Sequence, residues 1–300
     1  MMCFHYPANL CKEINGDIAK FWWGNAMDES KIHWKSWHSL CRGKESGGLG
    51  FRDLMDFNLA LLGKQCWRML SNPDAYWVRV LKPKYFPNEE LMQAKVRARA
   101  SWAWSSLIAR RDVILLHARC QIFNGRKTNI WNDSWIPPPH QGLLIPRTLI
   151  PESASRYVSE IMDHGNHRWN LEPIEAWLDN GSLEAIRRIP MGAMEESDRF
   201  VWPWSSDGLY YVKLGYHFLH SKEQNGSIMG QSSHLILDLV WKLIWSLKTL
   251  PKIKLFCWRI LNKALATRLE LFKVRCALSP VCPICEQAEE SIEHTLFLCP

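Results

Sequence analysis

Four residues near the carboxyl end of the chain have the types and the spacing of a metal site. Cys282 and Cys285 form a C-x2-C pair, and His294 and Cys299 follow after eight and four intervening residues. Zinc prefers thiolate and imidazole ligands, and two cysteines spaced in this way can hold one ion from a single tight turn. Ordinary core cysteines and a surface histidine rarely coincide so closely in sequence. The spacing therefore predicts one zinc ion bound by Cys282, Cys285, His294 and Cys299.

The number of ligands decides what this zinc could do. Three thiolates and one imidazole fill the tetrahedral shell, whereas a catalytic zinc keeps one position open for water or substrate. We therefore expect a structural ion. The remaining seven cysteines contain no second C-x2-C pair, which argues against a RING-type ubiquitin ligase with two zinc ions.

Other catalytic motifs are missing from the sequence. The chain has no Asp-Asp pair that could hold two metal ions, no G-x-S-x-G elbow and no H-E-x-x-H helix. The glycine-rich run SGGLGF at 46–51 lacks the Lys-Ser/Thr of a phosphate-binding loop, so a plain turn is the better interpretation. We assign no catalytic residue and expect neither an enzyme on its own nor a small-molecule substrate.

Helices are expected to position most of the chain. Apolar residues recur at spacings of three and four from Met55 to Met69, and Asn72-Pro73 should end that helix. Pro251 suits the first turn of another helix, whose apolar arc would run from Ile253 to Ala264. The segment ESIEHTLFLC predicts a short helix that carries His294, with Cys299 near its end.

Two turn signals predict small β-hairpins. Asn124-Gly125 and Asp207-Gly208 each lie between short β-prone runs. The sequence thus predicts a mainly α-helical, multi-lobed fold with two small β-hairpins, ending in a small zinc-stapled helical lobe. We expect a helical segment at 1–94, a middle connector at 95–200 with a hairpin near 119–131, and a zinc-binding domain at 201–300.

Positive charge is concentrated in two stretches. The net charge is +7, and residues 91–111 hold five bases and no acid, while residues 252–275 hold seven bases and one acid. Such stretches are either solvated helix faces or surfaces for a polyanion, and the sequence leaves both open. The candidate nucleic-acid contacts are Lys252, Arg259, Lys263 and Arg268 in the second stretch and Lys95, Arg97, Arg99, Arg110 and Arg111 in the first. Trp245, Trp258, Trp102 and Trp104 could stack on bases, although aromatic side chains are more often part of a core.

The amino-terminal sequence has no basic region followed by a long apolar run, and no stretch reaches 18 uncharged apolar residues. Ten cysteines without a secretion signal favour a reducing compartment. We expect a protein of the nucleus or cytoplasm that is neither secreted nor bound in a membrane. The oligomeric state is left open.

The metal motif and the residues before it resemble a known family. The C-x2-C-x8-H-x4-C motif follows VWKLIWSLKTLPKIKLFCWRILNKALATR at 240–268, and WPWSSDGLYYVKLGY lies upstream at 202–216. GRKTNIWNDSWIP at 125–137, FWWG at 21–24 and GGLGFRDL at 47–54 complete the pattern. In order and composition these blocks resemble the carboxyl-terminal part of plant LINE-type (non-LTR) retrotransposon reverse transcriptases, including their zinc-binding domain.

The resemblance implies part of an RNA-directed DNA polymerase polyprotein, with residues 1–94 similar to the region after the polymerase palm. The aspartates of the polymerase and the carboxylates of ribonuclease H have no counterparts here. We therefore expect a zinc-stabilised fragment whose metal lobe presents bases and aromatic side chains to RNA or DNA. The alternative is a zinc-stapled structural or protein-interaction domain, including a transposon remnant without function.

Overall fold

The computed structural model describes residues 3–24, 31–88, 91, 94–96, 99–111, 117–137, 142–151, 153–163, 165–225 and 238–300. The chain forms two compact units: unit 1 is Met1–Tyr6 with Asp56–Asn225, and unit 2 is Pro7–Met55 with Gly226–Pro300. The described residues are mainly helical with two small antiparallel sheets, which confirms the predicted fold class. The division at residues 94 and 200 stays a prediction about segments of sequence. No described helix is long and apolar enough to cross a bilayer.

The helices of unit 1 include the one predicted from the apolar spacing between Met55 and Met69. They are α3 (Leu54–Ser71), α4 (Tyr76–Tyr85), α5 (Trp102–Arg110), α7 (Asn180–Arg187) and α8 (Val212–Asn225), with short 3-10 turns η2 (Val158–Ile161) and η3 (Glu175–Trp177). As expected, α3 ends just before Asn72-Pro73. Its buried Asp56 carboxylate lies 3.0 Å from Nδ1 of the buried His220 on α8, so the two helices share a polar contact inside the unit.

Tyr210 ties the segment before α8 to α3. Its hydroxyl donates to the carbonyl of Ala60 at 3.0 Å, and the Lys64 ammonium donates to the Tyr210 carbonyl at 2.7 Å. The Tyr210 ring packs edge-on against Trp202 and lies near Trp67. Burial raises the pKa of the Tyr210 hydroxyl well above its usual value. Trp202 and Tyr210 of this block are therefore core residues, whereas Trp204 and Tyr211 are exposed.

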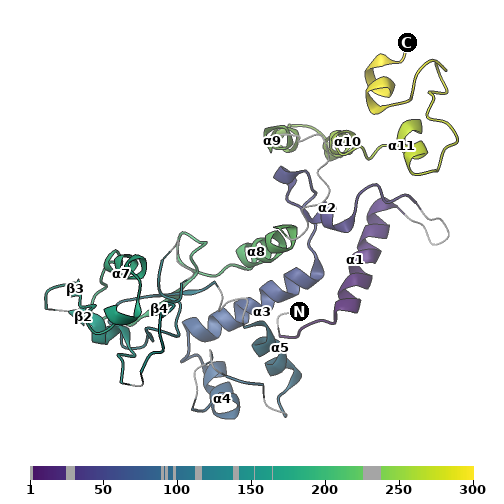
Figure 1. Ribbon diagram of the computed structural model, residues 1–300. Helices are drawn as coiled ribbons and strands as arrows, with labels where there is room; N and C mark the ends of the chain where they lie inside the picture. Colours follow the sequence, from purple (N-terminus) through teal and green to yellow (C-terminus); the bar gives the residue numbers. More distant parts are fainter. Residues whose placement is uncertain are drawn as a thin grey trace. The chain divides into compact units, whose positions relative to one another are not determined.

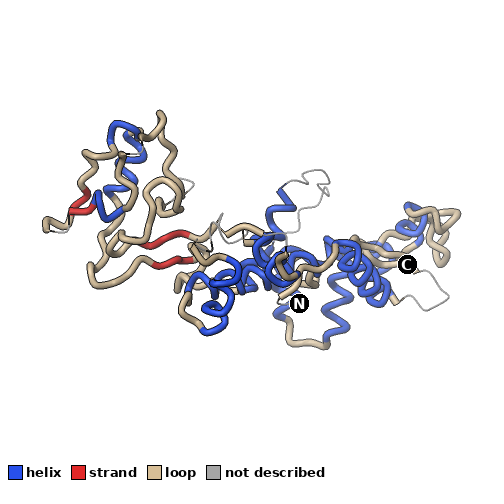
Figure 2. Tube along the Cα trace, turned by 90° about the horizontal axis from the view of Figure 1, so that it is seen from below, coloured by secondary structure: helices blue, strands red, loops and turns tan. Residues whose placement is uncertain are grey.

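The sheets differ from the predicted hairpins. Strand β1 (Arg119–Gln121) pairs antiparallel with β4 (Arg199–Val201), and β2 (Met162–Asp163) pairs with β3 (Arg168–Trp169). Figure 2 shows these strands as short segments among loops. The hairpin predicted near 119–131 is wrong, because β1 finds its partner about eighty residues later. The hairpin predicted across Asp207-Gly208 is also wrong, since β4 pairs with β1 and the described residues after the turn lead directly into α8.

Asp198 explains why the Asn124-Gly125 segment forms a loop. Its carboxylate accepts the backbone N–H groups of Phe123 at 2.8 Å and Gly125 at 2.9 Å, and the hydroxyl of Thr128 at 2.9 Å. In a hairpin, the backbone N–H groups of Phe123 and Gly125 would instead need hydrogen bonds to a paired strand. Because Asp198 immediately precedes β4, the same contact brings β4 beside β1.

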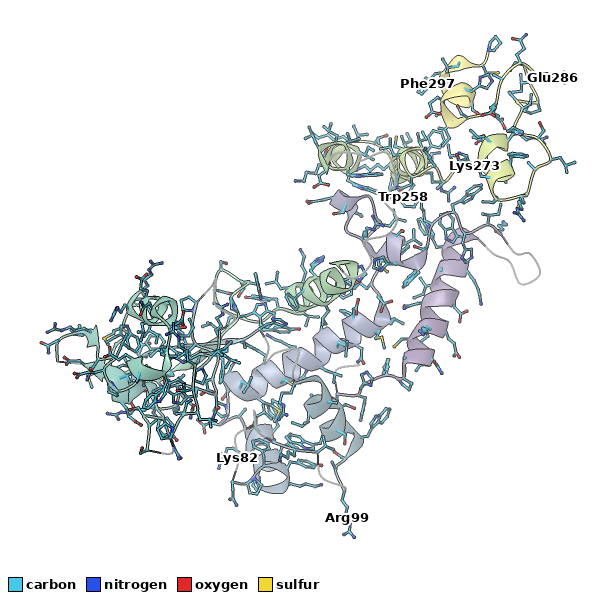
Figure 3. The ribbon with its side chains drawn as sticks, viewed as in Figure 1. Lys82, Arg99, Trp258, Lys273, Glu286 and Phe297 are labelled. Atoms are coloured by element: carbon cyan, nitrogen blue, oxygen red, sulfur yellow. The ribbon has the colours of Figure 1, made fainter. Side chains whose placement is uncertain are left out.

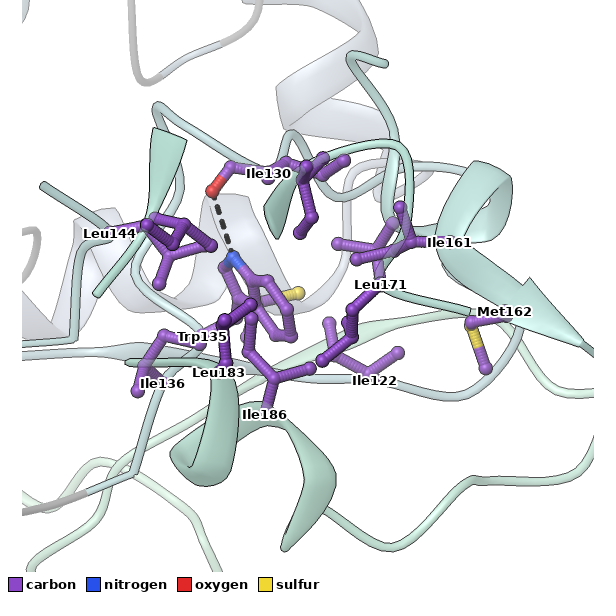
Figure 4. Close-up of a cluster of buried hydrophobic side chains, with 14 residues drawn as sticks. Ile122, Ile130, Trp135, Ile136, Leu144, Ile161, Met162, Leu171, Leu183 and Ile186 are labelled. Carbon is purple, nitrogen blue, oxygen red and sulfur yellow. Dashed lines mark hydrogen bonds between the residues drawn. The ribbon is translucent and has the colours of Figure 1, made fainter. Parts of the chain in front are cut away.

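A buried cluster centred on Trp135 holds the middle of unit 1 together. The indole Nε1 donates to the carbonyl of Ile130 at 3.0 Å, so this large side chain is buried without an unpaired polar group (Figure 4). The surrounding side chains come from loops as much as from helices. They include Ile122, Ile136, Leu144, Ile161, Met162, Leu171, Leu183 and Ile186.

Unit 2 is built around tryptophan. It contains α1 (Ala8–Trp23), α2 (Trp37–Cys41), η1 (Lys44–Ser46), α9 (Asp238–Ser246), α10 (Pro251–Leu261), α11 (Arg268–Lys273) and the π-helical turn η4 (His294–Leu298) (Figure 1). α9 packs against η1 and α10. The buried core of this unit is made of Trp23, Leu40, Trp241, Ile244, Trp258 and Ala264.

The glycine-rich run is a structural turn beneath this core. The Gly47 carbonyl accepts the indole N–H of Trp258 at 2.8 Å and the amide of Asn262 at 3.2 Å. Gly47 has a φ of 80°, and a Cβ at this position would lie 2.9 Å from the Trp241 ring. The turn therefore needs glycine in order to approach two tryptophans closely.

Gly48→Ala is expected to destabilise unit 2. A Cβ at Gly48 would lie 2.1 Å from the carbonyl oxygen of Arg42, and because that atom is backbone the turn itself would have to move. We expect the free energy of unfolding to fall by about 2–3 kcal/mol in a urea titration followed by circular dichroism. The matched control is Gly16→Ala in α1, where a Cβ meets nothing within 4 Å and stability should rise by about 0.5–1 kcal/mol. Equal stability of the two variants would contradict the close packing of the turn.

Candidate metal centre

The first two predicted ligands lie on a tight turn closed by backbone hydrogen bonds. The Cys282 N–H donates to the Ala288 carbonyl at 2.8 Å, and the Glu286 N–H donates to the Cys282 carbonyl at 3.0 Å. Val281 and Glu289 form an antiparallel bridge at the base of this turn. Glu286 has a φ of 54°, so the chain reverses direction just after Cys285. Both thiols are thereby presented from one short loop.

The second pair of ligands flanks the turn η4. His294 begins η4, its N–H accepted by the Ser291 hydroxyl at 3.1 Å, and Cys299 follows directly, donating its N–H to the His294 carbonyl at 2.8 Å. This agrees with the expected short helix carrying His294 with Cys299 near its end. The wide turn brings two residues five positions apart to the same side.

The four ligand atoms meet at distances suited to zinc. All of them lie within 4.8 Å of one another. The Cys282 and Cys299 sulfurs are 3.9 Å apart, and the Cys285 sulfur is 3.3 Å from Nε2 of His294. A tetrahedral ion with Zn–S bonds of about 2.3 Å separates two sulfur ligands by about 3.8 Å. The donor set and its spacing therefore fit one zinc ion.

Backbone N–H groups prepare the thiols for metal binding. The N–H groups of Cys285 and Ile284 lower the pKa of the Cys282 thiol, and those of Gln287 and Ala288 lower the pKa of Cys285. Desolvation, with the neighbouring thiols, raises the pKa of Cys299 to about 11. Zinc binds thiolates, so a bound ion would supply the charge that favours ionised Cys299.

The centre is a closed one. Three sulfurs and one imidazole complete the shell, so the arrangement suits a structural ion and leaves no site for a reacting water. Within the part of the chain that the structure describes, these are the only residues grouped closely enough to hold a metal in this way. Cys276 is nearby in sequence but is exposed and outside the group.

Known proteins match both the metal centre and the rest of the chain. The sequence family described as zinc-binding in reverse transcriptase matches residues 210–300. An uncharacterized mitochondrial protein of Arabidopsis thaliana is 40% identical over 137 residues, which are 45% of this chain and 89% of that protein. The chain belongs to the plant retroelement-derived family with a reverse transcriptase zinc-binding domain.

A longer relative matches nearly the whole chain. A putative ribonuclease H protein of Arabidopsis thaliana is 25% identical over 298 residues, or 98% of this chain, but those residues are only 47% of that protein. No solved structure matches. The comparisons confirm the predicted resemblance, and the family match agrees with the structural zinc predicted from the spacing.

The metal lobe, residues 276–300, is acidic. Residues 276–300 contain four glutamates and no lysine or arginine. Figure 3 shows Glu286 and Phe297 on this lobe, and the Phe297 side chain is exposed. These 25 residues therefore present no bases, and the bases that were expected to contact nucleic acid, Lys252, Arg259, Lys263 and Arg268, come earlier in the chain. All described lysines and arginines of unit 2 precede residue 276, some in helices and some in loops.

The candidate contacts in the second basic stretch lie only partly on a helix. Lys252 and Arg259 are exposed and lie two turns apart on one side of α10. Lys263, however, lies beyond the last helical residue, Leu261, with a φ of 52°. The expected continuation of the helix through Ala264 is therefore wrong, although Lys263 is exposed. Arg268 is also exposed and begins α11.

These bases are not neutralised by acids near them. None of Lys252, Arg259, Lys263 and Arg268 forms an ion pair with any residue that the structure describes. In the same unit, α11 places Lys273 beside Glu270 at 2.7 Å, and Lys242 lies 3.7 Å from Glu45. The positive charge of α10 and of the residue after it thus remains available to an external anion.

Spacing in the sequence did not reveal two further bases near Lys263. The half-buried Lys35 has its pKa lowered by desolvation and then by the positive charges of Arg42 and Lys263, with Glu270 opposing them. Lys35, Arg42 and Lys263 come from distant parts of the sequence, and the charges of the last two act on Lys35, with Glu270 partly offsetting them. We call these three bases the Lys35 cluster. Only folding brings these three bases together, so no local sequence pattern could have predicted their proximity.

Lys35→Met is expected to stabilise the protein slightly at neutral pH. A lowered pKa means that the charged lysine is less favourable in the folded than in the unfolded state. The gain should be below about 1 kcal/mol and shrink only partly in 1 M salt, because salt does not screen desolvation. It should fade as the pH rises from the lowered pKa of Lys35 toward the unfolded-state value of about 10.4. Thermal melts at pH 7 and at pH 10 measure the difference. A Lys35→Met protein that is less stable at pH 7 would contradict the unfavourable burial of a charged Lys35 beside other bases.

The first basic stretch lies in unit 1 and is less uniform than predicted. Lys95 and Arg99 are exposed. Arg111 instead uses its guanidinium inside the unit, where Nη1 donates to the carbonyls of Leu91 at 3.0 Å and of Ala94. Its prediction as a nucleic-acid contact is therefore not favoured by the structure. Arg97 and the side chain of Arg110 lie outside the described residues.

The four candidate tryptophans divide into core and surface. Trp258 and Trp104 are 1% and 2% exposed, so neither can stack on a base, and that hypothesis is wrong for both. Trp102 is 60% exposed with its ring stacked on Phe4 at 4.8 Å. Trp245 is half-buried and donates its indole N–H to the Lys44 carbonyl at 3.1 Å. Only Trp102 and Trp245 keep an accessible surface.

Proposed function

We propose that this reverse transcriptase zinc-binding protein binds RNA or DNA through the basic surface of unit 2, with zinc fixing the adjoining lobe. The observation that carries the proposal is the charge distribution. The described residues of unit 2 contain sixteen lysines and arginines against ten acids, and residues 242–275 contain nine of those bases against one acid. The phosphates of a nucleic acid complement such a surface.

Some exposed bases of unit 2 lack acidic partners among the described residues, which favours binding of a polyanion over a role in solubility alone. A solvated helix face is usually interspersed with acids that pair with its bases. Here Lys252, Arg259 and Lys263 are exposed without acidic partners among the described residues, and the Lys35 cluster concentrates further charge. A surface that keeps repelling bases together gains most when a polyanion neutralises them.

Zinc would act through the contact between the metal lobe and α11. The Arg268 N–H donates to the Glu290 carboxylate at 2.6 Å, and the Leu269 N–H donates to the Glu290 carbonyl at 3.3 Å. Glu290 lies between Cys285 and His294, so an ion bound there would fix its position. The metal lobe thereby caps the first turn of α11 and orients Arg268.

The polymerase and ribonuclease H activities of the wider family are not proposed for residues of this chain. Its metal site suits a structural ion, and the chain spans about half the length of the putative ribonuclease H protein that it matches. We propose that the protein contributes binding to such a system. Its location in the nucleus or cytoplasm stays a prediction.

The affinity for a labelled single-stranded RNA at several salt concentrations tests this proposal. The zinc-loaded full chain should bind at 50 mM salt, and log affinity should fall against log salt with a slope of about −2 or steeper, since each phosphate contact contributes about 0.7. Failure to bind at low salt, with zinc still present, would overturn the proposal. Repeating the titration with single-stranded DNA measures which nucleic acid is preferred.

A zinc-stapled protein-interaction lobe is the second candidate, and one observation favours it. The metal lobe exposes large apolar side chains: Leu278, Ile284, Phe297 and Leu298 are between 68% and 101% exposed. Apolar surface of this kind is typical of protein interfaces. A protein partner would bind through a few buried anchors with a shallow salt dependence, which the same titration distinguishes from phosphate binding.

A further inference from the structure

A cavity of about 410 Å³ lies within unit 2, between the amino-terminal segment and the turn that joins α9 to α10. Its walls include Trp22, Phe51, Trp245 and Leu255, and Lys44 and Lys254 lie at its edge. The volume falls within the range of about 300–1,000 Å³ that small-ligand pockets occupy. None of the residues that line it is acidic.

Aromatic contacts hold the walls of this cavity in place. The rings of Trp22 and Phe51 meet edge to face with centroids 5.2 Å apart, and Trp37 stacks on Phe51 at 5.5 Å. The Trp245 indole is anchored by its hydrogen bond to the Lys44 carbonyl. Flat rings fixed in this way can receive another flat ring with little loss of side-chain entropy.

Two ammonium groups lie beside the Trp245 wall. Lys254 donates to the Trp245 carbonyl at 2.9 Å, which leaves two of its three N–H groups for another acceptor. The exposed Lys44 ammonium lies 4.9 Å from the Trp245 ring centroid. It therefore covers the face on which a ligand would stack, but its flexible stem can move the charge toward a ligand's phosphate.

We propose that this cavity holds one nucleobase of a bound single-stranded nucleic acid. The base stacks against Trp245 or Phe51, and Lys44 and Lys254 contact the phosphates on either side of it. This inference rests on the proposed function, because it names a base-binding subsite within the same basic unit. The absence of acids and the combination of flat apolar walls with two cations match the chemistry of a nucleotide.

Abasic oligonucleotides separate this subsite from general phosphate binding. The full zinc-loaded chain is titrated with a single-stranded RNA and with an abasic strand of the same length and charge. Stacking should make the complete strand bind about tenfold or more tightly, with a steeper salt slope, because only an inserted base places its flanking phosphates beside Lys44 and Lys254. Equal affinities would overturn the subsite while leaving the proposed function intact. Binding of neither strand would instead contradict the proposed function.

Two matched lysine variants test the location of the subsite. Lys254→Met and Lys248→Met each remove one positive charge, and the two lysines are six residues apart in the sequence. Only Lys254 lines the cavity. Lys254→Met should reduce the preference for the complete strand over the abasic strand, and Lys248→Met should leave that preference unchanged. Equal effects of the two variants on the preference would overturn the assignment.

Filling the cavity gives a second variant that removes no charge. Thr249 lines the cavity from the turn between α9 and α10, and Thr249→Trp places an indole there. This variant should bind both strands with equal affinity and with the salt slope that the unaltered protein shows for the abasic strand. Its thermal melt and zinc content verify folding, and a folded Thr249→Trp protein that still prefers the complete strand would contradict the proposal.

Discussion

Cys282→Ser is expected to abolish zinc binding and unfold the metal lobe. Cys282 is buried, with its sulfur 3.9 Å from that of Cys299, and serine cannot replace a thiolate in the zinc shell. Zinc binding in comparable small lobes supplies about 10–16 kcal/mol of free energy, much of which is folding free energy. The zinc content should fall from one ion per chain to near zero, and hydrogen exchange should accelerate throughout residues 276–300.

Two control variants separate loss of the ligand from general damage. Cys276→Ser changes an exposed cysteine outside the group and should keep one zinc per chain. His294→Cys preserves four ligands and should also retain the ion, because zinc accepts four thiolates. A Cys282→Ser protein that holds zinc with unchanged affinity would show that the four residues are not the ligand set.

Charge reversal at Lys252, Arg259 and Lys263 is expected to cause the second-largest effect. Each glutamate would replace an exposed base with a charge that repels phosphate. The affinity for single-stranded RNA at low salt should fall about 100-fold or more, and the salt slope should become shallower by about 2, or about 0.7 for each of three lost contacts. Both quantities come from the same salt titration.

A triple reversal in unit 1 provides the control for this loss. Arg126, Lys127 and Arg187 are exposed, and reversing them changes the net charge by the same amount. This control should change affinity far less and leave the salt slope nearly unchanged. If both triple variants lose affinity equally, net charge and not the surface of unit 2 governs binding.

The metal centre could be predicted from sequence because its determinants are local. Cys282 and Cys285 lie on one turn, and His294 and Cys299 flank one short helical turn, so their spacing alone sets most of the geometry. The α3 helix and its end at Asn72-Pro73 could be predicted for the same reason. In each case the decisive contacts join residues close together in the chain.

Long-range contacts explain what sequence reasoning missed. β1 pairs with β4 because Asp198 binds the backbone of a loop more than seventy residues earlier, and a turn signal cannot reveal that. Trp258 is buried because Gly47, in a distant turn, accepts its indole N–H. The Lys35 cluster likewise requires folding to bring its three bases together.

Hydrogen exchange of the zinc-loaded full chain, with and without single-stranded RNA at low salt, tests the central claim most directly. We predict that RNA protects the peptides spanning α10 and α11 and those around Lys35 and Arg42, and that 1 M salt removes this protection. A basic binding surface on unit 2 would be contradicted if RNA protected only unit 1 or only the acidic metal lobe. It would also be contradicted if RNA bound without protecting any peptide.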